Sequence, residues 1–150
     1  MRRVILTVMV ATTVAVAPAA LAQEPLPLPF TIDTARLAAD SHTVVVAGTY
    51  TCPELNLDVD DGGGGGTIDL TVNQDGVAGF GYVHIQGRVC DGTTRTWETD
   101  VTTFGERRFQ RGPAQALASG LVTGEDAAGN KVTLQVAILS PGQPITITRR

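Results

Sequence analysis

The residues that could carry chemistry are few in this chain of 150 residues. Its two histidines, His42 and His84, show neither His-x-His spacing nor a neighbouring cysteine pair, so no zinc site is indicated. His42 follows Asp40 and Ser41, which are the residue types of a catalytic triad. Neighbours in sequence seldom form the hydrogen-bonded chain of a triad, because a strand sends alternate side chains to opposite faces. We expect His42 to be a solvated turn residue and His84 to be an ordinary strand residue.

The segment that most resembles a metal site is the acidic stretch before five consecutive glycines. Asn56, Asp58 and Asp60 have the alternate spacing that begins an EF-hand loop, and calcium prefers such oxygen ligands. However, Asp61 occupies the place of the required glycine, and Thr67 stands where a bidentate glutamate is needed. We therefore predict a solvated acidic turn and assign no metal, with a low-affinity calcium loop as the alternative.

Two carboxylates, Glu98 and Asp100, share one face of a predicted strand. Neighbours on one strand face lie about 6–7 Å apart, a separation that paired carboxylates of a glycosidase could use. Nothing in the sequence indicates a cleft, so a solvated face is the preferred interpretation. The glycine run is not a phosphate loop, because it lacks the Gly-Lys-Ser/Thr ending and a following helix. We predict a non-enzymatic protein without a cofactor, and keep a small hydrolase as a minor alternative.

A basic cluster surrounds one aromatic residue in a predicted loop: Arg107, Arg108 and Arg111 flank Phe109. Arginine beside an exposed aromatic is typical of recognition hot spots, and such a cluster could also hold an anionic polymer. The other interpretation is a loop whose Phe109 plugs the end of the domain. We name Arg107, Arg108, Phe109 and Arg111 as the candidate binding residues.

The first 22 residues have the pattern of a secretory signal peptide. Arg2 and Arg3 precede an apolar run from Val4 to Val16, and Ala20-Leu21-Ala22 offers a cleavage site. The run is shorter than the roughly 20 apolar residues that cross a bilayer. We predict cleavage after Ala22 and release of a secreted, extracellular chain with no membrane insertion; an uncleaved anchor is the alternative.

Cleavage would leave an acidic chain. Loss of Arg2 and Arg3 leaves 9 of the 11 basic residues against 15 acidic ones, which takes the net charge from -4 to -6. This balance argues against a nucleic-acid or anionic-membrane partner. We expect a monomer with a flexible Pro-rich leader at residues 23–30 and one domain at residues 31–150.

Cys52 and Cys90 are the only cysteines of the chain. In an exported protein they should pair as a disulfide. There is no Cys-x-x-Cys motif to lower a thiol pKa, so redox catalysis is not indicated. Since aromatic residues are scarce, the core must be built mainly from Val, Ile, Leu and Ala, and the disulfide should stabilise it.

Apolar residues alternate with polar ones along most of the chain, and no segment shows helical spacing over three turns. Between Ala78 and Cys90, Phe80 and Tyr82 fall on the opposite phase to Val83 and Ile85, so we expect a bulge near Gly87. Seven to eight short strands predict an all-β sandwich or barrel. The expected strands cover 43–52, 67–74, 78–90, 95–104, 115–123, 131–139 and 145–148, with a weak edge strand at 30–37.

Two cysteine strands with Trp97 nearby favour an immunoglobulin-like (Ig-like) β-sandwich with one disulfide, although Trp97 follows the second cysteine instead of lying between the pair. Four stretches, at 37–40, 44–53, 90–97 and 109–114, resemble a group of small, uncharacterised secreted actinobacterial proteins. The resemblance implies an Ig-like fold and no catalytic residue, and it covers most of the mature chain.

These features predict a secreted, non-enzymatic Ig-like module that contacts an extracellular protein or a cell-surface glycan through its loops. The alternative is a secreted inhibitor of an extracellular hydrolase or protease. In that case Thr51–Leu57 or Asp91–Arg95 would be the inhibitory loop, because the disulfide would hold it rigid.

Overall fold

The computed structural model describes residues 24–57, 65–86 and 90–149, and every regular element in these ranges is a strand. The predicted signal peptide, the acidic loop at Asp58, Asp60 and Asp61, and the bulge near Gly87 lie outside the described residues. Nowhere in the described ranges is there a helix with the length and apolar character needed to cross a membrane. The strands are β1 (Leu26–Pro27), β2 (Thr34–Leu37), β3 (Thr43–Thr51), β4 (Gly65–Gln74), β5 (Val77–Ile85), β6 (Thr94–Thr103), β7 (Gly112–Glu125) and β8 (Lys131–Arg149).

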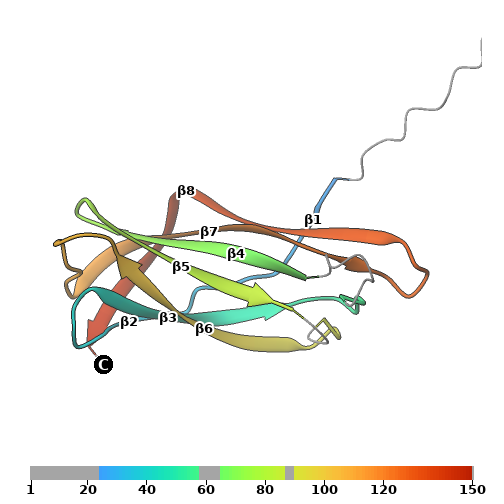
Figure 1. The fold of residues 1–150 in the computed structure, drawn as a ribbon, viewed down its shortest axis with the longest axis horizontal. Helices are drawn as coiled ribbons and strands as arrows, with labels where there is room; N and C mark the ends of the chain where they lie inside the picture. The colour runs from blue at the N-terminus through green and yellow to red at the C-terminus, as the bar shows by residue number, and fades with distance from the viewer. Residues whose placement is uncertain (1–23, 58–64, 87–89, 150) are drawn as a thin grey trace, which may run out of the picture.

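A single sheet closes on itself into a seven-stranded barrel (Figure 1). Its strand order is β8-β2-β3-β6-β5-β4-β7, and β7 pairs with β8 to complete the wall, while β1 attaches to β8 from outside. The all-β class is therefore confirmed, but the Ig-like sandwich is wrong. Closure depends on β8, which pairs with β7 along most of its length and with β2 near its end.

The two strands predicted at 131–139 and 145–148 form one long strand, β8. Its register against β7 shifts between Ala116 and Ala118, so the residues around Ser140-Pro141 form an irregularity in a continuous strand. Prolines are tolerated at such bulges because they lack an N–H for the ladder. Gly142 adopts a φ of 88°, a left-handed conformation that favours glycine. The Pro-Gly segment therefore bends the strand without ending it.

The barrel interior holds the core, and the predicted alternation decides which side chains enter it. Trp97 and Val101 of β6 are buried, whereas Glu98 and Asp100 are exposed, as predicted. In β5 the structure resolves the conflicting phases, because Val83 and Ile85 point inward. The fully buried side chains include Ile68, Leu70, Val72, Val44, Val46, Val122, Leu134 and Ile147.

The predicted disulfide is present and joins Cys52 to Cys90, with Cα atoms 4.7 Å apart. Two backbone hydrogen bonds flank it: the N–H of Leu55 donates to the Cys90 carbonyl at 3.0 Å, and that of Gly92 donates to the Cys52 carbonyl at 2.9 Å. The disulfide therefore connects the segment that follows β3 to the segment that precedes β6.

The Pro-rich leader, predicted to be flexible, pairs with the barrel from Leu26 onward. Leu26 and Pro27 pair in parallel with Leu134 and Gln135 of β8, and the N–H of Leu28 donates to the Gln135 carbonyl at 2.8 Å. The reason is burial, since the Leu28 side chain is only 5% exposed. The weak edge strand at 30–37 is also corrected, because β2 lies between β3 and β8.

Candidate functional site

The Asp40-Ser41-His42 stretch is a turn, as predicted. Oδ1 of Asp40 accepts the backbone N–H groups of His42 and Thr43, each at 3.0 Å. The bond from Thr43, followed by that from His42, holds the pKa of Asp40 below its ordinary value. The His42 ring lies 3.1 Å from the Thr103 hydroxyl instead of near a serine. The carboxylate therefore fixes the loop into β3 and is not arranged as part of a triad.

The basic loop divides into a buried aromatic and its exposed neighbours. Phe109 is 1% exposed, and its N–H donates to the Ser41 carbonyl at 2.9 Å. The prediction that Phe109 is a surface recognition residue is therefore wrong. The other interpretation, in which Phe109 plugs the domain, is confirmed. Arg107 donates to the Gly76 carbonyl at 2.9 Å, while Arg108 and Arg111 are exposed. A binding role for Arg107, Arg108 and Arg111 stays a prediction.

The two loops considered for an inhibitor are held by the barrel. In Thr51–Leu57 the side chains of Leu55 and Leu57 are buried, and the N–H of Asn56 donates to the Glu125 carbonyl at 2.8 Å. In Asp91–Arg95 the aspartate forms an ion pair with the arginine at 2.7 Å. The segment 51–57 does not protrude from the barrel, so it does not favour the inhibitor hypothesis. That hypothesis stays a prediction.

Asp91 gives this loop a measurable acid sensitivity. The hydroxyl and then the N–H of Thr93, together with Arg95, lower the pKa of Asp91 from 3.8 to about 2. A depressed pKa in the folded state means that Asp91 contributes stability above pH 3.8, which is lost as the pH falls toward about 2. We expect Asp91→Asn to narrow the drop in melting temperature between pH 4 and pH 2, measured by circular dichroism. Identical drops in the two proteins would contradict this assignment.

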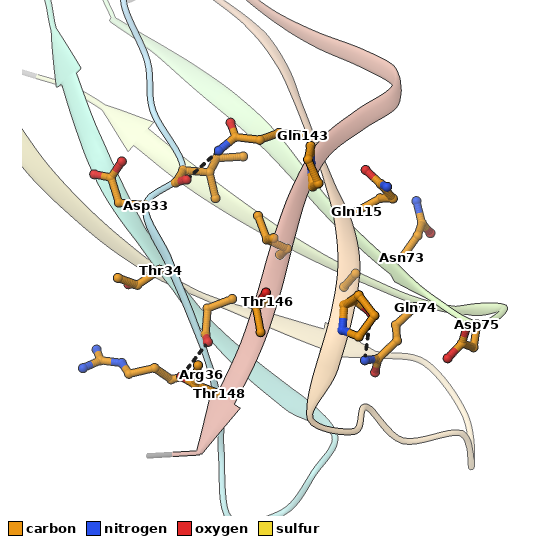
Figure 2. A pocket seen from close by; sticks show the side chains of 16 residues that line it. Asp33, Thr34, Arg36, Asn73, Gln74, Asp75, Gln115, Gln143, Thr146 and Thr148 are labelled. Carbon is orange, nitrogen blue, oxygen red and sulfur yellow. Dashed lines mark hydrogen bonds between the residues drawn. The ribbon is translucent and has the colours of Figure 1, made fainter.

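A hollow of about 830 Å³ opens where β8 passes between β2 and β7 (Figure 2). Two of its four amide side chains are engaged by the fold. Gln143 donates to the Ile32 carbonyl at 2.7 Å, and Gln74 donates to the carbonyls of Gln110 at 3.0 Å and Pro113 at 3.2 Å. We therefore interpret Gln74 and Gln143 as structural, whereas Asn73 and Gln115 line the hollow from facing positions of β4 and β7.

An exposed aromatic row on the outside of β5 was missed by the sequence reasoning. Phe80 is 44% exposed and Tyr82 is 56% exposed, and Phe104, which follows β6, is 79% exposed. The rings of Phe80 and Phe104 are 5.8 Å apart between centroids. The sequence signal for their exposure was the two-residue period of β5, because Phe80 and Tyr82 fall on the strand face opposite to that of Val83 and Ile85. Such side chains contribute nothing to the core.

Carboxylates flank this row on both sides. Asp69 of β4 lies directly opposite Tyr82 in the register, and Glu98 and Asp100 of β6 face outward on the other side. A groove of about 580 Å³ runs between β5 and β6. It is lined by Phe80, Gly81, Tyr82, His84, Glu98, Thr99 and Asp100. We call the surface formed by Phe80, Tyr82, His84, Phe104, Asp69, Glu98 and Asp100 the aromatic face.

The groove exists because β5 and β6 pair over only two positions. These are Gly79 with Thr103 and Phe80 with Thr102. β6 stays close to β5 beyond them, because the Asp100 carbonyl lies against Gly81 and the Tyr82 carbonyl accepts a hydrogen bond from the Thr99 hydroxyl at 2.8 Å. After Tyr82 no further pairing joins the described residues of β5 to β6 (Figure 1).

Two of the polar side chains of the aromatic face have partners within the barrel. Glu98 is engaged by Arg36 at 2.6 Å, and His84 by the Thr67 hydroxyl at 3.1 Å. Within the described ranges no group of three or more His, Cys, Asp or Glu side chains could hold a metal ion.

The fold and this surface define a class: a disulfide-linked, seven-stranded β-barrel with an aromatic outer face. No protein-family model matches this chain, and no match is found among curated proteins. Its function therefore has to be argued from the aromatic face itself.

Proposed function

We propose that this protein is a secreted, non-enzymatic module that binds an extracellular protein or a cell-surface glycan on its aromatic face. The observation that carries the proposal is the exposure of Phe80, Tyr82 and Phe104 on one side of a barrel whose core is filled without them. Apolar surface that gathers in one place and is rimmed by polar residues marks interaction sites. Aromatic side chains in such places supply much of the binding energy.

Export is part of the proposal. The basic residues, apolar run and Ala-x-Ala site at the N-terminus support a signal peptide cleaved after Ala22. The Cys52–Cys90 disulfide supports an oxidising compartment, because such bonds are rare in reducing ones. The closed barrel supplies a rigid frame, so a partner would meet side chains that are already in place.

The double variant Phe80→Thr, Tyr82→Thr tests this function. We expect retention of the mature chain on cell envelopes of the producing organism to fall by about tenfold or more, because central aromatics dominate interface energies. The matched control is Leu121→Thr, Leu139→Thr, which removes two other exposed apolar side chains, 48% and 63% exposed. An equal loss in both double variants, at unchanged melting temperature, would contradict the proposal.

A further inference from the structure

We infer that the partner presents an extended, basic peptide segment to the aromatic face. This inference rests on the proposed function and specifies the chemistry of its partner. Two independent observations lead to it: the charge of the surface and the linear course of its groove along the outer side chains of β5.

The charge of the aromatic face is one-sided. Among the described residues the ion pairs are Arg36 with Glu98 and Arg95 with Asp91. Neither Asp69 nor Asp100 has a cationic partner in the part of the chain that the structure describes. A neutral partner that covers the rings would remove water from these carboxylates without compensating their charge, which costs free energy.

Lysine or arginine side chains satisfy both features of the surface at once. A cation compensates the carboxylates, and it is also attracted to the face of an aromatic ring within about 6 Å. Asp69 is directly opposite Tyr82, where cross-strand Cβ atoms lie about 4.5–5.5 Å apart. A cation placed over the Tyr82 ring would therefore also lie close to Asp69. Charge complementarity makes a basic partner the best fit.

The groove favours an extended polypeptide. The groove between β5 and β6 runs beside Phe80, Tyr82 and His84, which follow one another on the outer side of β5. Side chains on one face of an extended peptide laid along this groove would repeat every 6–7 Å or so, which is also the spacing of these three residues along β5. Alternate basic residues would then face the aromatic row and its carboxylates.

The test uses a ten-residue peptide that alternates arginine with threonine, titrated onto the mature, disulfide-bonded chain by fluorescence anisotropy at low salt. We expect Asp69→Asn, Asp100→Asn to weaken binding by about tenfold. The control Glu24→Gln, Glu54→Gln removes equal charge from exposed positions elsewhere and should leave binding within about twofold. In Asp69→Lys, Asp100→Lys the preference should reverse toward a glutamate–threonine peptide of the same length.

Three outcomes would overturn the inference. Equal weakening in the control would mean that net charge alone attracts the peptide. No measurable binding of the basic peptide, while envelope retention still requires Phe80 and Tyr82, would leave the proposed function standing and remove its basic partner. Binding of neutral cellohexaose or chitohexaose that requires the same two rings, without peptide binding, would identify a glycan partner instead. If envelope retention does not depend on Phe80 and Tyr82, the proposed function itself is contradicted.

Discussion

Replacement of Phe109 by alanine is expected to lower the free energy of unfolding by about 3–5 kcal/mol, as for other buried phenylalanines. The ring is 1% exposed and lies against Gly79, where a Cβ atom would come within 2.8 Å of the ring. The inner surface of β5 is therefore shaped around this side chain, and alanine would leave a cavity that the closed wall cannot fill.

Chemical denaturation of the disulfide-bonded protein measures this loss. Phe104→Ala is the matched control, because its ring is 79% exposed and its removal should change stability by no more than about 0.5 kcal/mol. If the two alanine variants unfold at the same denaturant concentration, Phe109 does not plug the barrel.

Removal of the disulfide is the second large effect that we expect. The bond closes a loop between residues 38 positions apart, for which the chain-entropy model gives about 3–4 kcal/mol. That is a large share of the roughly 5–15 kcal/mol by which domains of this size are stable. The double variant Cys52→Ala, Cys90→Ala should therefore unfold at a much lower denaturant concentration than the oxidised protein.

A reductant provides the internal control for this prediction. It should shift the denaturation curve of the native sequence toward that of the double alanine variant and leave the variant itself unchanged. Superimposable curves for oxidised and reduced native protein would show that the bond contributes little to stability.

Local pattern in the sequence was enough for most of the strands and for the disulfide. Period-two alternation placed Ile68, Leu70, Trp97 and Val101 in the interior, because a strand with one buried face permits only one phase. Alternation does not say which strand lies beside which. The pairing of Ala35 with Ile147, which helps to close the barrel, joins residues more than 100 positions apart, and no local signal encodes it.

The candidate site was less predictable for a related reason. Phe109 lies in a loop, where no periodicity shows whether a side chain is buried, so the arginines around it suggested a surface residue. Phe80 and Tyr82 share their strand with Val83 and Ile85. Because both faces of this strand carry apolar side chains, the sequence did not show which face is exposed. Besides the phase of β5, a second signal was the glycine pair Gly79 and Gly81, which have no side chains and are packed closely on the inner side of the strand.

The position of β8 also has a consequence for when the molecule can fold. Its final residues pair with β2, one of the first elements of the chain, and with the beginning of β7. Until these residues of β8 are in place, β2 and the beginning of β7 each keep an open edge. Such long-range contacts are slow to form, so the docking of this end of β8 is the step that completes the native topology.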